Sequence, residues 1–370
     1  MIAMPSLPEP SIGSKAGEPP LRLDEALADI ADAAGDLDRS PRFPSREIRG
    51  LAACGALSYT VPTSDGSRPS IADEWQLVRR IAAASGSVGR IVDGHLNAVE
   101  RIATAAPAEV RRRELEGVLA GRRLLGVWGA DPGPGEGEPA TLVAAADGWE
   151  LNGAKTFCSG AGGVDAALVM ARGEDPGPPY LVLVGMDESA EVDRGWFNAG
   201  GLRASESHRV IFDRTPVVAV IGEPGELGRE PWFSRDALRT AASWAGMIDG
   251  AVADAFADLA SRRRGEDISS LAAGRISAAQ GTVDAWFSAA AHAVEANAPL
   301  RGLSIRMRNE IVAASRTILD EAARACGSRP FALGSALDRA RRDLEIFTLQ
   351  HRLDPMLIEE GRKLLEPERE

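Results

Sequence analysis

The chain has 370 residues, 44% of them hydrophobic, which is enough to bury a large core and to form two or three domains. Its formal net charge of −12 excludes the basic face that a nucleic-acid groove or an anionic membrane surface requires, so a small molecule is the expected ligand. The three cysteines are too few and too far apart for a disulfide framework or a zinc site. The sequence contains neither an apolar run of membrane-spanning length nor a signal peptide, which predicts a cytoplasmic protein.

The first third of the chain is predicted to be helical. Residues 1–20 lack apolar periodicity and are expected to form a flexible tail. From Leu23 onward apolar residues recur at helical spacing, and the pattern resumes after Pro44 and again over residues 71–103. Residues 21–121 therefore form the predicted N-terminal helical domain.

The middle of the chain is predicted to be a β domain, residues 122–230. Residues 149–159, WELNGAKTFCS, have the pattern of a hairpin whose turn is Asn152-Gly153. Further β-rich segments occur at 167–172, 180–186 and 201–213, separated by Gly/Pro-rich breaks. The Gly133–Gly137 stretch, GPGEG, lacks the strand-to-helix setting of a dinucleotide loop and is expected to be a mobile loop beside the site.

The last part of the chain, residues 231–370, is rich in Ala and Arg and has long helical periodicity. Its final helix is predicted to carry Leu344, Phe347 and His351 on one face. The fold class is thus mixed α and β, with the order helices, sheet, helices.

Two motifs carry a family resemblance. Trp149–Lys155, WELNGAK, resembles a Trp-x-Leu-x-Gly-x-Lys hallmark, and Gly201–Ser207, GLRASES, leads into a Val-x-Phe-Asp-like strand. In this order they are similar to the middle domain of the acyl-CoA dehydrogenase superfamily. The resemblance implies an N-terminal helical domain, a central β-barrel domain and a C-terminal four-helix bundle, with a flavin, FAD or FMN, held where they meet.

The resemblance also nominates cofactor contacts. Phe157 would cover the flavin ring, Cys158 would present backbone, and Ser159 would hydrogen-bond near N5. Val127, Trp128 and Gly129 would lie along the other side of the ring, although core packing is an equal alternative for Trp128. Further candidate contacts are Arg203 and either Ser205 or Ser207, whereas the neighbouring His208 is expected to face solvent.

The catalytic base of the dehydrogenases is missing from its usual place. Aligning Arg342-Asp343 with the Arg-Asp pair of relatives puts His351 where a catalytic Glu would stand. Some relatives carry the base at the start of the bundle instead, and Asp236 falls near that position. Its alternative role is that of an acidic residue in the first turn of a helix.

A branch of the superfamily similar to dibenzothiophene monooxygenase has His in this C-terminal region. Its members take reduced flavin from a separate reductase and activate oxygen, work suited to groups that titrate near neutrality. Three residues match that branch, and they predict a pocket of His95, Ser159 and His351. The expected function is a monooxygenase acting on a small organic substrate. The alternative is an FAD-dependent acyl-CoA dehydrogenase that acts on an acyl thioester and passes electrons to an electron-transfer flavoprotein.

Two other motifs of the family are degraded. The Arg-x-x-Phe-Gly motif, which grips the flavin pyrophosphate across a subunit interface, is reduced to Arg262–Gly265, RRRG, and the Gly-Gly motif to Gly327-Ser328. Arg262 remains a candidate contact. The loss fits FMN, or reduced FAD that exchanges, and also fits a flavin-free scaffold. Relatives complete this site between subunits, so a homotetramer or homodimer is expected.

Overall fold

A computed structural model describes residues 22–63, 66–146, 148–262, 266–350 and 352–365. The order of its elements is helices, then strands, then helices, as predicted. The tail predicted over residues 1–20 lies outside the described residues.

Helices occupy the chain up to residue 119. Helices α3 and α4 each begin at a serine, Ser70 and Ser85, whose hydroxyl accepts a hydrogen bond from the backbone N–H three residues later. Ser85 also ends α3, which divides the helical pattern of residues 71–103 into two helices. The helices are α1 (Leu23–Arg39), α2 (Ser45–Ala53), the short 3-10 helix η1 (Ala56–Ser58), α3 (Ile71–Ala84), α4 (Gly86–Ala105) and α5 (Ala108–Leu119).

A seven-stranded sheet follows, in the order β1-β4-β5-β7-β3-β2, with β6 paired to β7. β1 runs parallel to β4, and the other pairs are antiparallel. β7 pairs with both β5 and β3, so it joins the two halves of the sheet. The strands are β1 (Leu125–Trp128), β2 (Thr141–Ala145), β3 (Gly148–Cys158), β4 (Ala166–Ala171), β5 (Tyr180–Gly185), β6 (Ala190–Asp193) and β7 (His208–Val220), with 3-10 helices η2 (Arg203–Ser205) before β7 and η3 (Glu226–Gly228) after it.

The predicted hairpin at Asn152-Gly153 is wrong. Residues 148–158 form one strand, and the pair marks a register shift between Leu151 and Gly153 in its pairing with β7. Gly153 has a φ of +105°, and a Cβ there would lie 2.5 Å from the carbonyl oxygen of Pro139. The Asn152 amide oxygen accepts a hydrogen bond from the Arg214 backbone N–H at 2.8 Å. Gly153 is therefore required by a bulge and a close backbone approach.

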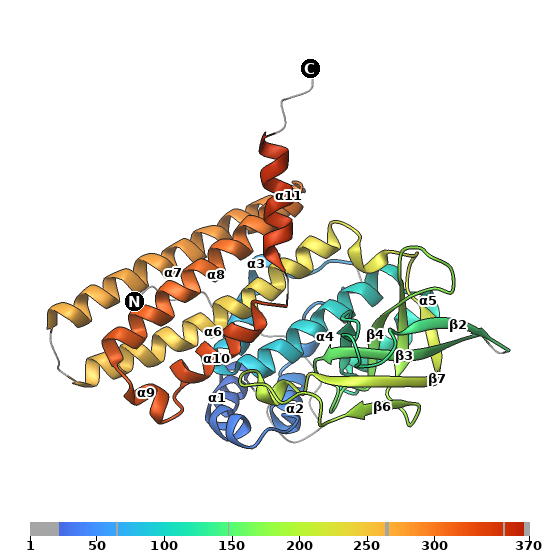
Figure 1. The fold of residues 1–370 in the computed structure, drawn as a ribbon, viewed down its shortest axis with the longest axis horizontal. Coiled ribbons are helices and arrows are strands. Elements are labelled where there is room, and N and C mark those ends of the chain that lie inside the picture. Colours follow the sequence, from blue (N-terminus) through green and yellow to red (C-terminus); the bar gives the residue numbers. More distant parts are fainter. Residues whose placement is uncertain (1–21, 64–65, 147, 263–265, 351, 366–370) are drawn as a thin grey trace.

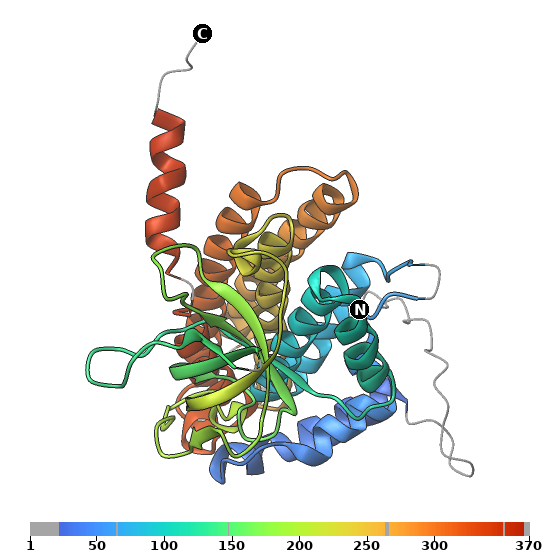
Figure 2. The same ribbon diagram turned by 90° about the vertical axis from the view of Figure 1, so that its right-hand side faces the viewer.

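The remaining helices build the bundle drawn at the left of Figure 1. The predicted final helix is divided, because α10 ends at Phe347 and α11 starts at Leu353. In Figures 1 and 2, α11 extends away from the rest of the molecule. The helices are α6 (Trp232–Arg262), α7 (Glu266–Glu295), α8 (Arg301–Cys326), α9 (Arg329–Ala332), α10 (Ala336–Phe347) and α11 (Leu353–Leu365).

The N-terminal helices and the bundle share one core. α3 packs against α6, and a Cβ on Gly246 would overlap the carbonyl oxygen of Arg79, so only glycine allows this approach. Cys54, Cys158 and Cys326 are buried and free of disulfides, in line with their spacing. Within the described ranges, no helix is both long and apolar enough to cross a membrane.

Candidate functional site

The end of β3 exposes an aromatic side chain on a strained backbone. Phe157 has a φ of +52°, in the left-handed region that a bulky residue rarely adopts. The pairing of β3 with β7 shifts register between Lys155 and Cys158, which places Phe157 within the irregularity. Its side chain is 54% exposed, although it is large and apolar. An exposed ring held on strained backbone is typical of a binding surface.

Trp196 completes this aromatic surface from the loop after β6. Its ring meets Phe157 edge to face, with 4.9 Å between centroids and 85° between planes. The Trp196 indole N–H donates to the Glu136 carboxylate at 3.1 Å, and the other carboxylate oxygen accepts from the Gly133 backbone N–H at 2.7 Å. The GPGEG loop thus lies beside the candidate site, and Glu136 ties it to the aromatic pair.

A chain of three serine hydroxyls lies next to Phe157. Ser159 Oγ is 2.8 Å from Ser207 Oγ, which is 2.7 Å from Ser205 Oγ. The Gly160 N–H donates to the Ser205 carbonyl at 2.8 Å, so the end of β3 is fixed to the η2 segment. These contacts bring together Ser159 and Ser205, which the sequence nominated separately.

The end of β1 supports this segment from behind. Trp128 is buried, and its indole N–H donates to the Ser159 carbonyl at 3.1 Å. The Gly129 carbonyl accepts from the Lys155 ammonium group at 3.2 Å, and Lys155 also pairs with Asp131 at 2.7 Å. Trp128 is therefore a core residue that positions Ser159, while the partly exposed Val127 and Gly129 remain candidate contacts.

The other nominated cofactor contacts differ in position. The Cys158 side chain is fully buried, and burial raises the pKa of its thiol, so only its backbone can face a ligand. Arg203 is half-buried at the start of η2, close to the serine chain in sequence. Arg262 is the last residue of α6, and its side chain, like residues 263–265, lies outside the described part of the chain.

His95 does not belong to an accessible pocket, which corrects the predicted trio of His95, Ser159 and His351. Its side chain is fully buried, Nδ1 accepts from the Leu125 N–H at 3.0 Å, and Nε2 lies 2.9 Å from the Leu57 carbonyl. Because Nδ1 accepts, the proton must be on Nε2. Burial lowers the pKa of His95 to about 4. A neutral His95 therefore links α4 to η1 and β1, a structural role.

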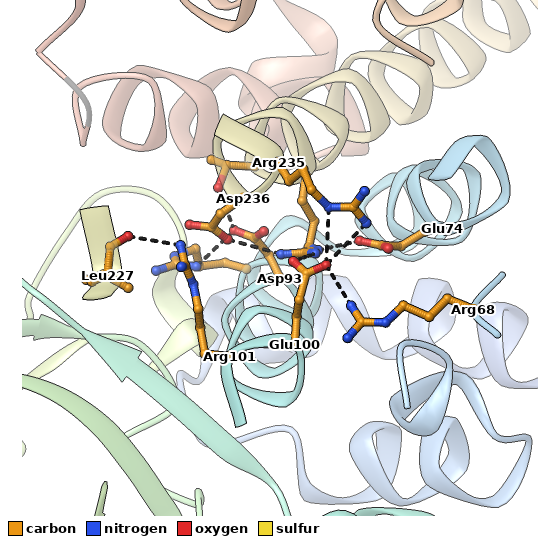
Figure 3. A network of polar contacts seen from close by, with 11 residues as sticks. Arg68, Glu74, Asp93, Glu100, Arg101, Leu227, Arg235 and Asp236 are labelled. Atoms are coloured by element: carbon orange, nitrogen blue, oxygen red, sulfur yellow. Dashed lines mark hydrogen bonds and ion pairs between the residues drawn. The ribbon is translucent and has the colours of Figure 1, made fainter. Parts of the chain in front are cut away.

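Asp236 lies in a buried ionic network between α3, α4 and α6 (Figure 3). Arg239 is the centre of this network: it donates to Glu74 at 2.6 Å and to Glu100 at 2.8 Å, and it pairs with Asp236 at 3.2 Å. Burial, opposed by Arg239, raises the pKa of Asp236 to about 6. Its side chain is 20% exposed, the most of the three carboxylates bound to Arg239.

The Arg342-Asp343 pair, used to align the predicted base, is a structural junction. Arg342 donates to Asp38 of α1 at 2.8 Å and to the Gly200 carbonyl at 2.6 Å, and Asp343 accepts from the Leu202 N–H at 2.5 Å. Burial raises the pKa of Asp343 to about 6. His351 itself lies outside the described residues.

Sequence reasoning named Ser207 as an alternative to Ser205, but it missed Trp196 as a site residue and misplaced His208. His208 is buried, with its ring edge to face with Phe197 at 6.4 Å, instead of facing solvent. No local pattern marks Trp196, because it reaches Phe157 only through the pairing of β6, β7 and β3.

These residues fit a flat aromatic cofactor such as flavin. Phe157 and Trp196 offer an exposed apolar surface, Ser159 offers a hydroxyl, and the register shift frees the end of β3 from regular pairing. An aromatic surface with a few fixed polar groups is the usual composition of a cofactor site.

Comparisons with known proteins agree with the resemblance found in the sequence. The chain is 25% identical over 227 residues to a putative acyl-CoA dehydrogenase, YdbM, of Bacillus subtilis, which covers 56% of this chain and 59% of that protein. It is 30% identical over 208 residues to dibenzothiophene monooxygenase of Rhodococcus qingshengii, covering 52% and 48% respectively. The chain thus matches about half the length of these curated relatives. No family model matches it.

Solved structures match over almost the whole chain. FMN-bound TdsC from Paenibacillus sp. A11-2 superposes with a TM-score of 0.82 at 22% identity, over 92% of this chain and 95% of TdsC. KijD3 in complex with FMN and a dTDP-sugar gives a TM-score of 0.81 at 20% identity, over 94% and 93%. The mixed α and β fold is therefore the one seen in these proteins.

Proposed function

We propose that this protein is a flavin-dependent oxidoreductase, and specifically a monooxygenase that uses reduced flavin and O2 on a small organic substrate. The observation that carries the proposal is the surface at the end of β3, where the strained and exposed Phe157 lies beside the Ser159 hydroxyl. FMN is present in solved structures of the same fold, TdsC and KijD3. Under this proposal, the flavin ring packs on Phe157 and Trp196.

The chain's own residues have distinct tasks in this proposal. Bound flavin supplies the redox chemistry and the reaction with oxygen. Phe157 and Trp196 exclude water from one part of the site, and Trp128 holds the Ser159 carbonyl so that its hydroxyl has a fixed position. Ser159 then presents a proton at Oγ, and His351 remains a proposed catalytic residue. Gly129, Val127, Arg203 and Arg262 remain proposed cofactor contacts, whereas the fully buried Ser205 acts on a ligand only through the serine chain.

The proposal includes the organisation of the chain and its partners. We assign residues 21–121 to an N-terminal helical domain, 122–230 to a central β-barrel domain and 231–370 to a C-terminal four-helix bundle. A flavin reductase would supply reduced flavin. A homo-oligomer is supported by α11, which extends from the body and exposes Ile358, Leu364 and Leu365.

Stopped-flow absorbance tests the proposed reaction. The protein is mixed anaerobically with reduced FMN and then with oxygen, and we expect a long-lived band at about 380 nm. Ser159→Ala and His351→Ala should shorten its lifetime, whereas Ser315→Ala, a buried serine on α8 that bonds only to its own helix at Val312, should not. A band that decays as fast as that of free flavin would contradict a monooxygenase.

A second candidate, an FAD-dependent acyl-CoA dehydrogenase, is supported by the pKa of Asp236, raised to about 6 by burial. A carboxylate with this pKa suits proton abstraction near neutral pH. The ion pair with Arg239 makes it less suitable, because the carboxylate already has a buried partner. Bleaching of bound FAD by an acyl-CoA without oxygen, lost in Asp236→Asn, would support this candidate. Failure to bind either flavin would leave a flavin-free scaffold.

A further inference from the structure

The hydroxyls of Ser159, Ser207 and Ser205 form a continuous hydrogen-bonded chain. Ser207 lies between Ser159 and Ser205, and both of its Oγ contacts are short enough for hydrogen bonds, at 2.8 Å and 2.7 Å. Among the described residues, no other hydrogen bond of these three hydroxyls is found. Within the described part of the chain, the three hydroxyls therefore form hydrogen bonds only with one another.

Counting protons fixes the direction of this chain. Each hydroxyl has one hydrogen and can accept two, so three hydrogens serve two internal bonds and one hydrogen remains for an outside acceptor. If this third hydrogen belonged to Ser205 or Ser207, which are only 0% and 4% exposed, a buried donor would have no acceptor. Ser159 is the most exposed of the three at 9%, and it lies next to the exposed Phe157. The favourable direction is therefore Ser205 to Ser207 to Ser159.

We propose that Ser207 is a positioning residue that commits the Ser159 hydroxyl to donate, rather than accept, a hydrogen bond toward a ligand at the end of β3. Ser207 donates to Ser159 Oγ, which directs the Ser159 hydrogen outward and polarises it. In this arrangement Ser205 donates its hydrogen to Ser207 and accepts none from it. This inference rests on the proposed flavin site, because it assumes that the ligand presents an acceptor to Ser159.

The proposal predicts a preference between redox states of the ligand. Oxidised flavin has an acceptor nitrogen at N5, whereas reduced flavin carries an N–H there. A fixed donor at Ser159 favours the oxidised form. To accept from the reduced form, either Ser159 turns its own hydrogen away from the ligand, where the described residues place no acceptor, or the chain reverses and the Ser205 hydrogen is buried without a partner. Without Ser207, the Ser159 hydroxyl is free to rotate, so its hydrogen is no longer held toward the ligand.

Anaerobic titration measures this preference without any turnover. Dissociation constants for oxidised FMN and dithionite-reduced FMN are obtained for the wild type, Ser207→Ala, Ser207→Thr and Ser205→Ala. For Ser207→Ala we expect about fivefold weaker binding of oxidised FMN, because the Ser159 hydroxyl is no longer oriented and polarised, and no weakening of reduced FMN. Ser207→Thr keeps a hydroxyl and should restore the wild-type ratio. Ser205→Ala should change the ratio by less than about twofold, because Ser207 can still donate to Ser159.

The remaining outcomes separate this inference from the proposed function. Equal weakening of both redox forms in Ser207→Ala, or equal effects of Ser205→Ala and Ser207→Ala, would overturn the directed chain while leaving the flavin site in place. No binding of either form by the wild type would overturn the proposed function and this inference with it. Ser315→Ala, in α8, is the control for a buried serine outside the chain.

Discussion

Two polar regions of the molecule are built in opposite ways. Around Arg239, buried carboxylates of α3, α4 and α6 have short ionic contacts, and the backbone is regular helix. At the end of β3, the backbone is strained at Phe157, an aromatic side chain is exposed, and the hydroxyl chain has one hydrogen without a partner. The first region connects helices, whereas the second leaves surface and hydrogen-bonding capacity for a ligand.

The largest predicted effect is a loss of folding stability when Arg239 is substituted. In Arg239→Met, Glu74 loses its 2.6 Å partner and becomes an uncompensated buried charge, whereas Glu100 loses a 2.8 Å contact but keeps its ion pairs with Arg68 and Arg235. We expect the free energy of unfolding to fall by about 3–5 kcal/mol, measured by urea denaturation. A loss below about 1 kcal/mol would show that the network does not hold α3, α4 and α6 together.

A second prediction concerns the pH dependence caused by His95. Its folded pKa of about 4 is below the ordinary value of 6.5, so the unfolded chain binds a proton that the folded chain does not between these values. The stabilisation that comes from keeping His95 neutral is fully present above pH 6.5 and is lost as the pH falls to about 4. The free energy of unfolding should fall by about 3 kcal/mol in total over this range.

Urea denaturation of the wild type and His95→Gln across this range checks the prediction. The Gln amide can still donate to the Leu57 carbonyl, so the variant should fold and have a shallower pH dependence. Identical slopes for the two proteins would show that another group causes the acid sensitivity.

At the strained residue Phe157, we expect a substitution to change FMN binding and to leave stability almost unchanged. Phe157→Gly removes the left-handed strain of about 1–2 kcal/mol and also the edge-to-face contact with Trp196, worth about 0.5–1.5 kcal/mol, so the melting temperature should hardly change. FMN binding, measured by quenching of flavin fluorescence, should weaken about tenfold because the ring loses its apolar surface. A large fall in melting temperature with unchanged FMN binding would show that Phe157, like Arg239, stabilises the fold and does not bind the ligand.

The smallest predicted change is at the loop that supports Trp196. Glu136→Gln keeps an acceptor and a similar shape but removes the charge from the bonds to Trp196 and Gly133. We expect FMN binding to weaken about two- to fivefold with no loss of stability beyond about 0.5 kcal/mol. An unchanged FMN affinity would show that the loop does not position Trp196.

Sequence reasoning predicted the element order well because long helical periods and β-rich runs are local signals, as in α3, α4, β4 and β5. It failed at Asn152-Gly153, where a turn-like pair serves a bulge in the pairing with β7, a partner distant in sequence, and a close approach to Pro139. It nominated Phe157 and Ser159 through their place in a motif, and they stay predicted site residues. It could not distinguish the structural His95 from a catalytic one, since that depends on backbone partners at Leu57 and Leu125.

A crystal structure of the protein with FMN tests the central claim most directly. The account predicts electron density for the flavin ring against Phe157 and Trp196, with Ser159 Oγ within hydrogen-bonding distance of it. A flavin bound elsewhere, or crystals that contain no FMN at concentrations that saturate related flavoproteins, would contradict the assignment of the end of β3 as the cofactor site.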